Sequence, residues 1–335
     1  MTSDPHRGPL ALTQLGHSQV GPCAVNFNPT MASIPVLLDT DIGSDIDDAL
    51  AIAYLLGQPR CELLGITTVS GRDPRIRASL ADAVCRAAGR TDIPIHSGCA
   101  TRFDTGAIIQ PEVPQAAILD RFPHRPPADF AQGTAIDFLR RTINNRPGEI
   151  VLLAIGPLTN LALLEALEPG ILSKLRGLML MCGHFTLSVP GYVPEWNARL
   201  DPLATQAVYR LHRLPLHRSV GCDITRRIQL PVAEALPRFR AAGGALGVVA
   251  ACTEVWQDHA PVVVFHDPLA AACIFSPEFC TWQRGLVEVE TLSPRLGGYT
   301  SFSAQAEGPH EVAISVDAPA FLQEYFAVAA TAQPA

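Results

Sequence analysis

The 335-residue chain is poor in the features that mark nucleic-acid-binding and membrane proteins. It has a single lysine, Lys174, no run of basic residues and a formal net charge of −7, so it offers no positive field to a phosphate backbone. No apolar run reaches the roughly 18 residues that a membrane-spanning helix needs. Aromatic residues make up only 6% of the chain, yet 48% of it is hydrophobic, which suffices for a large core. We therefore expect a soluble protein that binds neither nucleic acid nor membrane.

The chain also lacks the cysteine and leader patterns of secreted proteins. Its nine cysteines are odd in number, contain no C-x-x-C pair and sit mostly in apolar stretches, which favours reduced thiols in the core. The first residues have no basic start followed by an apolar run, so no signal peptide is expected. These patterns indicate a cytoplasmic protein with a disordered extension over residues 1–33 and one α/β domain over residues 34–330.

Apolar runs of strand length alternate with longer amphipathic segments along the chain. The predicted strands lie at 34–39, 61–69, near 93, at 149–156, at 175–183 and near 216. The predicted helices lie at 49–56, 76–88, 129–144, 157–166, 201–212 and 239–258. This alternation predicts an α/β fold with a mainly parallel central sheet flanked by helices. Ligands bind beyond the carboxyl ends of such strands, so we expect the loops at 98–128 and 184–200 to rim the site.

Five aspartates fall within ten positions after the first predicted strand, in the segment "DTDIGSDIDDA". Acidic residues in a first helical turn complement the helix dipole, which explains Asp45, Asp47 and Asp48 in part but leaves Asp39 and Asp41 unexplained. Buried carboxylates so close together repel one another unless a cation lies among them. Oxygen ligands without a neighbouring Cys or His suit Ca²⁺ or Mg²⁺. The segment therefore predicts a site for a divalent cation.

A strand ending in D-T-D also begins the haloacid-dehalogenase-type phosphatases, in which one Asp is a nucleophile beside Mg²⁺. That chemistry needs a downstream lysine and a second acidic pair. Since Lys174 is the only lysine, the phosphatase stays an alternative with weaker support.

Several segments together resemble the inosine-uridine-preferring nucleoside hydrolase family. Its N-terminal signature, D-x-D-P-G-x-D-D-A, is similar to "DTDIGSDIDDA", which has two extra residues and an Ile in place of the Pro. "GITTVSG", "LLAIGPLTNLA", "PEWNARLDPLAT" and "HDPLA" follow in the family's order and spacing. The resemblance implies the nucleoside hydrolase fold, with its active site at the carboxyl ends of the strands.

The resemblance also implies how a metal would be held. Asp41, Asp48, Asp267 and the backbone carbonyl of Ile155 would bind Ca²⁺, and Asp41 would be the general base that activates water. Asp39 would support this shell from behind. Asp45 falls within the two-residue insertion and receives no role.

The family pattern further implies the residues that would contact a nucleoside. Asp47, Glu195 and Asn197 would bind ribose hydroxyls, while His266 would donate a proton to the leaving base. Apart from the resemblance, Trp256 and His259 stand near the end of the preceding predicted helix, from where they would stack on or contact that base. Each has a structural alternative: a core Trp, polar loop residues at 195 and 197, a structural His, and a helix that begins with Asp267 as its N-cap.

This chain departs from the family at the ends of the substrate pocket. Arg72 stands where many members have Asn, Tyr192 replaces an Asn on the 5′ side of the sugar, and no His-Gly-x-Ser/Thr-Gly motif occurs between 97 and 128. We expect a Ca²⁺-dependent nucleosidase that releases base and ribose, as a homodimer or homotetramer. The alternatives are the Mg²⁺-dependent phosphatase and a non-catalytic, metal-stabilised ribose-binding protein.

Overall fold

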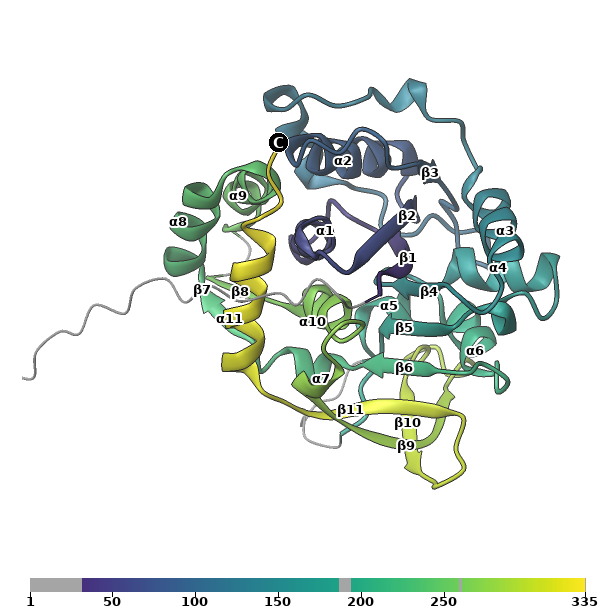
Figure 1. Ribbon diagram of the computed structural model, residues 1–335. Coiled ribbons are helices and arrows are strands. Elements are labelled where there is room, and N and C mark those ends of the chain that lie inside the picture. Colours follow the sequence, from purple (N-terminus) through teal and green to yellow (C-terminus); the bar gives the residue numbers. More distant parts are fainter. Residues whose placement is uncertain (1–31, 187–193, 259–260, 335) are drawn as a thin grey trace, which may run out of the picture. The chain divides into compact units, whose positions relative to one another are not determined.

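The computed structural model describes residues 32–186, 194–258 and 261–334 (Figure 1). The predicted extension at 1–33 therefore lies almost wholly outside the described residues, and the single domain at 34–330 stays a prediction. In the described part, no helix combines the length and apolar character required to cross a bilayer. Eight of the nine cysteines are described, and these eight are free thiols.

A nine-stranded sheet forms the centre of the described chain, in the order β10-β9-β11-β6-β5-β4-β1-β2-β3. Its strands are β1 (Ile34–Thr40), β2 (Cys61–Thr68), β3 (Ile95–Ser97), β4 (Val151–Ala154), β5 (Gly177–Met181), β6 (His217–Val220), β9 (Cys280–Val289), β10 (Thr300–Ala304) and β11 (His310–Val316). Strands β1 to β6 and β11 run parallel, whereas β9 and β10 are antiparallel additions at one edge. The mainly parallel α/β architecture predicted from the sequence is confirmed.

Helices connect the strands and cover the sheet. They are α1 (Asp47–Gly57), α2 (Pro74–Ala87), α3 (Ala135–Asn145), α4 (Thr159–Leu167), α5 (Trp196–Leu200), α6 (Pro202–Tyr209), α7 (Cys222–Thr225), α8 (Val232–Ala242), α9 (Gly244–Trp256), α10 (His266–Ala272) and α11 (Ala318–Ala329). Four short 3₁₀ segments, Pro114–Arg121, Pro127–Asp129, Leu172–Lys174 and Pro277–Phe279, and a small antiparallel pair, β7 (Gln229–Pro231) with β8 (Val262–Val264), complete the described elements.

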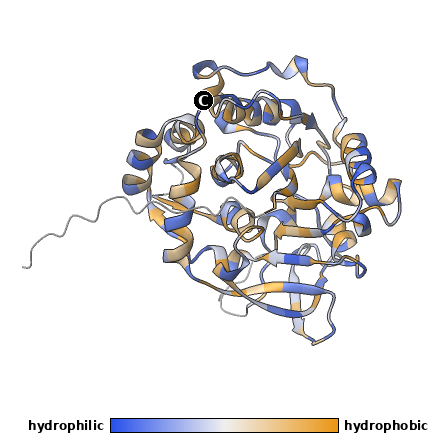
Figure 2. Cartoon of the chain, viewed as in Figure 1, coloured by the Kyte–Doolittle hydropathy of each residue, from blue (hydrophilic) through white to orange (hydrophobic). Residues whose placement is uncertain are grey.

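Two hydrophobic clusters hold these layers together. One includes Leu38 of β1, most of α1 and the inner faces of α2, α9, α10 and α11, and the other includes Leu37 of β1 and the inner faces of α4 and α6. Adjacent residues of β1 thus belong to different cores, as a strand buried on both faces requires. Figure 2 shows hydrophobic residues along the central strands and more hydrophilic residues on outer helices such as α3 and α8.

The structure corrects the predicted helix at 239–258. Two helices, α8 and α9, occupy this region and meet at Gly243 and Gly244, which have φ values of 67° and 51°. Positive φ is the left-handed region that glycine enters without the steric cost of a Cβ, so this pair of glycines ends one helix and redirects the chain into the next. The apolar periodicity continues across the break and conceals it. The helix predicted at 129–144 starts later, at Ala135, after a 3₁₀ turn.

Candidate active site

A cavity of about 470 Å³ opens beyond the carboxyl ends of the parallel strands. Nine of the residues that received a role from the sequence line it: Asp41, Asp47, Asp48, Ile155, Glu195, Asn197, Trp256, His266 and Asp267. They come from segments up to 226 positions apart, from Asp41 to Asp267, and meet because parallel strands deliver their carboxyl ends to one edge. Asp39 lies outside the lining, and His259 lies outside the described residues.

Each acidic residue reaches the cavity from the end of an element. Asp41 follows β1, while Asp47 and Asp48 form the first turn of α1, whose cap position is Ile46 and carries no side-chain cap. Asp267 is the second residue of α10, which begins at His266 and also has no side-chain cap. The alternative in which Asp267 serves as an N-cap is therefore wrong. Its carboxylate is left for the cavity.

Three carboxylates form a compact group. One oxygen each from Asp47, Asp48 and Asp267 lie within 4.8 Å of one another, and all three side chains are buried. The Thr40 hydroxyl donates a hydrogen bond to Asp48 and fixes its orientation. Such spacing of oxygen atoms is what a hard divalent cation draws together.

Asp41, which follows β1, lies against the backbone that follows the neighbouring strand β4. A Cβ placed on Gly156 would lie 2.9 Å from Asp41 Oδ1 and 3.0 Å from the Asp41 amide nitrogen, so the carboxylate lies against the backbone that follows Ile155. Glycine at 156 is thus a requirement of close approach. The absence of that one carbon lets Asp41 lie against Gly156, the residue that follows Ile155.

Burial dominates the electrostatics of this cluster. It raises the pKa of Asp47, Asp48 and Asp267 well above the usual range, and the neighbouring aspartates raise it further. The pKa of Asp41 is also raised by burial, with Arg77 opposing the shift. Buried carboxylates that repel one another favour either protons or a cation. The cluster therefore has the donor set and the excess negative charge of a cation site.

Asp39 and Asp45 differ from the cluster in their hydrogen bonds. Asp39 Oδ1 accepts from Thr67 Oγ1 at 2.5 Å and from Asn160 Nδ2 at 2.7 Å, and burial raises the pKa of Asp39 to about 7. Asp45 lines the cavity, accepts from the Ile46 amide at 2.6 Å, and has a pKa raised by burial to about 6. Asp39 thus lies behind the cavity, whereas Asp45 belongs to its wall.

Glu195 and Asn197 are less free than the sequence suggests. The Glu195 carboxylate caps α5 by accepting from the amides of Asn197 and Ala198, and it also accepts from the Gly183 amide at 3.0 Å. Asn197 Nδ2 donates to the carbonyl oxygens of Ile155 at 2.8 Å and Met181 at 3.0 Å. Both side chains therefore tie the end of β5 and the loop after β4 to α5, with their remaining lone pairs left for a ligand.

His266 and Trp256 line the side of the cavity reached from α9 and α10. Nδ1 of His266 is hydrogen-bonded to the Thr225 hydroxyl at 2.5 Å, so Nε2 is the ring nitrogen left for a ligand. Burial, with Arg226 and His184 adding to it, lowers the pKa of His266 to about 3. This histidine is neutral at pH 7 and can donate only through a neutral N–H. Trp256 is half-buried at the same wall.

Several further residues that received no role from the sequence complete the cavity wall: Ser44, Gln110, Met181, His184, Pro194, Trp196, Arg199, Cys222 and Arg226. His184 follows β5, and its position after a predicted strand is the sequence signal that indicates it. Gln110 belongs to the 98–128 loop that was expected to rim the site. Nothing in its local sequence distinguishes it from neighbouring polar residues.

The fold and the cavity together define an α/β protein with a carboxylate-lined candidate active site. A family model described as inosine-uridine preferring nucleoside hydrolase matches residues 36–323. The chain belongs to the inosine-uridine preferring nucleoside hydrolase family. It is accordingly a hydrolase that acts on N-glycosyl bonds, and the resemblance recognised from its motifs is confirmed.

Individual relatives agree with this assignment. A pyrimidine-specific ribonucleoside hydrolase from Escherichia coli strain SMS-3-5 is 30% identical over 283 residues, covering 80% of this chain and 88% of that protein. A purine-preferring ribonucleoside hydrolase from Gardnerella vaginalis superposes with a TM-score of 0.75 at 25% identity, covering 90% of this chain and 100% of that one. A plant nucleoside hydrolase gives a TM-score of 0.74 at 24% identity, covering 89% of this chain and 99% of that one. Family membership favours a nucleoside hydrolase over the phosphatase alternative.

Proposed function

We propose that the protein is a Ca²⁺-dependent N-ribohydrolase that releases the base and ribose from a ribonucleoside, with Asp41 as the general base. The observation that carries this proposal is the convergence of four buried carboxylates, Asp41, Asp47, Asp48 and Asp267, at one cavity in a nucleoside hydrolase fold. Cleavage by water requires an activated nucleophile, a stabilised oxocarbenium-like sugar and a leaving base that is not released as a free anion. The cavity offers side chains for each task.

The cation-binding residues in this proposal are Asp41, Asp48, Asp267 and the carbonyl oxygen of Ile155. These are oxygen ligands, which Ca²⁺ prefers. When bound, Ca²⁺ supplies positive charge that offsets the mutual repulsion of the carboxylates, acidifies a water molecule and attracts sugar hydroxyls. Asp41 then accepts the proton of the attacking water. Asp39, whose Oδ1 is held by Thr67 and Asn160, supports this shell from behind.

The sugar in this proposal is held by Asp47, Glu195 and Asn197. Asp47 stands at the start of α1, and its carboxylate oxygens accept hydrogen bonds from ribose hydroxyls. Glu195 and Asn197 are rigidly placed by their backbone partners, so they orient the sugar at little cost in side-chain entropy.

The base in this proposal lies between the rim and α10. Trp256 offers an aromatic surface, and His266 donates a hydrogen bond from Nε2 to the departing base. His259 belongs to the same proposal on grounds of sequence alone. A neutral N–H donor stabilises the negative charge that develops on the base as the glycosidic bond breaks. The base then takes its proton from solvent water, and His266 keeps its own.

A panel of purine and pyrimidine ribonucleosides with a reducing-sugar assay tests the proposal. Metal-stripped protein should release no ribose, and Ca²⁺ should restore release. Ligand binding without turnover in the Ca²⁺-loaded protein would instead identify the non-catalytic alternative, and phosphate release from phosphate esters the other one. The same assay with 2′-deoxynucleosides measures the contribution of the hydroxyl contacts, because a missing hydroxyl leaves its partners unpaired.

A further inference from the structure

Arg77 of α2 is fully buried and reaches toward the aspartate loop. Its Nη1 donates to the carbonyl oxygens of Asp41 and Ile42, the latter at 2.9 Å, and its Nε donates to the carbonyl of Ser70 at 3.2 Å. No ion pair joins it to a carboxylate among the described residues. A buried arginine usually pairs with a carboxylate, and Arg77 does not do so within the described part of the chain. Its role is therefore indicated by the acceptors of its hydrogen bonds.

The remaining nitrogen of Arg77 points at Gln110. Nη2 donates to Gln110 Oε1 at 3.1 Å, and the Ser44 hydroxyl donates to the same oxygen at 2.9 Å. Two donors on one side-chain oxygen fix which end of the amide is the carbonyl. The amide nitrogen of Gln110 is then the end left for Asp41, which lines the same cavity wall and whose pKa the Gln110 side chain helps to lower against the effect of burial.

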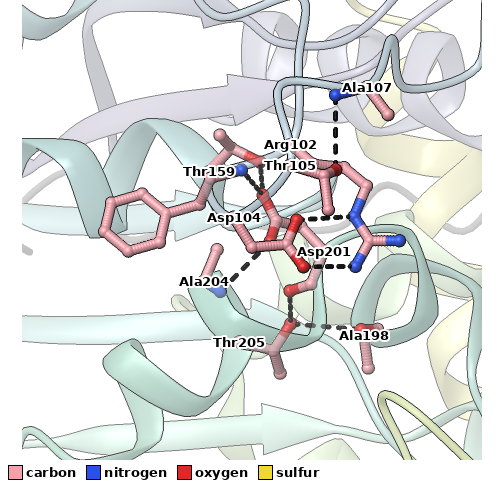
Figure 3. Close-up of polar contacts among 10 residues, drawn as sticks. Arg102, Asp104, Thr105, Ala107, Thr159, Ala198, Asp201, Ala204 and Thr205 are labelled. Atoms are coloured by element: carbon pink, nitrogen blue, oxygen red, sulfur yellow. Dashed lines mark hydrogen bonds and ion pairs between the residues drawn. The ribbon is translucent and has the colours of Figure 1, made fainter. Parts of the chain in front are cut away.

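The loop that carries Gln110 is fastened to the fold on both sides. The amides of Ser70 and Gly71 donate to the carbonyls of Cys99 and Ile109, each at 2.7 Å. On the other side, Asp201 accepts from the Phe103 amide and from the Thr159 hydroxyl, again each at 2.7 Å (Figure 3). The backbone of this loop is therefore held in place, which fixes the point from which the Gln110 side chain extends.

Gln110 itself has a φ of 41°, an unusual value for a residue with a Cβ. A strained backbone of this kind costs of order 1–3 kcal/mol and persists where the surroundings over-determine it. Arg77 Nη2 also reaches the Gln110 carbonyl at 3.5 Å, so one guanidinium contacts both the backbone and the side chain of this residue.

We propose that Gln110 is a positioning residue that holds the carboxylate of Asp41 in its reactive orientation, and that Arg77 and Ser44 in turn orient Gln110. The inference rests on the proposed function, because it assumes that Asp41 is the general base. Thr67 and Asn160 hold Asp39, and Thr40 holds Asp48. Gln110 is the side chain that does the same for Asp41. With one oxygen bound to the amide, the other faces the water that Asp41 deprotonates.

Replacement of Gln110 by residues of similar size tests the proposal. Gln110→Met fills the same space without donating, and Gln110→Glu keeps the shape but repels Asp41. Both should lower kcat by about 10- to 100-fold, the effect expected when a reacting group loses its alignment. KM for the nucleoside and the Kd for Ca²⁺, measured by calorimetry, should change by less than about 3-fold, because the proposal assigns Gln110 the alignment of Asp41 and no hydrogen bond to the nucleoside or the cation.

The matched control is Gln305→Ala. Gln305 is an exposed glutamine whose amide nitrogen donates to the hydroxyl of Ser303, and it does not line the cavity. It should leave kcat unchanged. Thermal unfolding checks that each variant is folded. If one of the two Gln110 variants does not fold, the kcat of the other still tests the proposal. A Gln110 variant with wild-type kcat, or with its loss confined to KM or Ca²⁺ affinity, overturns the positioning role alone. A wild-type protein that hydrolyses no ribonucleoside overturns the proposed function, and this inference with it.

Discussion

The two ends of the parallel sheet both bury titratable side chains, but they do so in opposite ways. At the carboxyl ends, Asp41, Asp47, Asp48 and Asp267 face a cavity, and burial favours their uncharged forms. At the amino ends of β6 and β11, two histidines pack their rings against Tyr209.

The histidine cluster consists of His217 and His310, the first residues of β6 and β11. The His217 ring stacks on Tyr209 with centroids 5.2 Å apart and meets His310 edge-on at 4.7 Å. His310 Nδ1 accepts from the Val287 amide at 3.0 Å, so its Nε2 carries the hydrogen and donates to the Tyr209 carbonyl at 2.9 Å. His310 is satisfied by these hydrogen bonds, whereas neither ring nitrogen of the buried His217 has a hydrogen-bond partner among the described residues and its ring is held by stacking. The carboxylates, in contrast, repel one another across a cavity and favour a ligand. The first arrangement is structural, and the second has the charge and the donor atoms of a candidate cation site.

The largest expected effect breaks the carboxylate end at Asp41. Asp41→Asn keeps the size of the side chain but removes its ability to accept a proton, so kcat should fall by about 10³-fold with saturating Ca²⁺ present. Ribose release under single-turnover conditions measures this step. A metal-replete variant that keeps the wild-type rate would show that Asp41 is not the base.

Asp267→Asn should act on the cation rather than on the proton. Loss of one charged ligand should weaken Ca²⁺ binding by about 100-fold, which corresponds to about 2.7 kcal/mol. The metal-stripped variant should be more stable than the metal-stripped wild type, because one repelling charge is gone. Calorimetric titration and thermal unfolding measure the two effects. Asp120→Asn, at an exposed position, is the control that should change neither. Unchanged Ca²⁺ affinity in Asp267→Asn would remove Asp267 from the ligand set.

Acidic pH should destabilise the folded protein through the histidine cluster. Burial lowers the pKa of His310 to about 4 and that of His217 well below its usual value, whereas both titrate near 6.5 when unfolded. Between pH 6.5 and 4 the unfolded chain binds the extra protons, so the free energy of unfolding falls as the pH falls through this window. His217→Phe keeps the stacking and should reduce the acid-induced loss by roughly 2 kcal/mol.

Urea unfolding of the wild type and His217→Phe at pH 7 and pH 4.5 measures this difference. The carboxylates contribute alike to both proteins and cancel in the comparison. Equal acid sensitivity of the two proteins would mean that His217 does not titrate on unfolding in this range.

A smaller effect is expected from Gly156→Ala, which adds one carbon beside Asp41. The new Cβ would meet Asp41 Oδ1 at 2.9 Å and Val69 Cγ1 at 3.0 Å, so the carboxylate or the loop must shift. We expect kcat to fall by about 10-fold, because small displacements of a reacting group are costly. The control is Gly247→Ala in α9, where the added carbon meets nothing within 4 Å. It should leave kcat unchanged and stabilise the helix slightly. Equal rates for both variants would refute the tight fit of Asp41 at Gly156.

The same contrast explains what could be predicted from the sequence. The aspartate run and the "HDPLA" segment are local in sequence, and strand ends mark where a ligand site forms, so these residues could be assigned to one cavity. The contacts of Arg77 with Ser44 and Gln110 join residues 33 positions apart in each direction and depend on the path of a long loop. The antiparallel strands β9 and β10 and the break at Gly243 were likewise missed. Edge strands have no helix to mark them, and apolar periodicity continues through a pair of glycines.

Ca²⁺ titration of the metal-stripped wild type tests the central claim most directly, with ribose release and thermal unfolding followed in the same samples. We predict that activity is absent at the start, that activity and the melting temperature rise together, and that both saturate at one Ca²⁺ per chain. Full ribose release from the metal-stripped protein, or a rise in stability without any ribose release, would contradict the account.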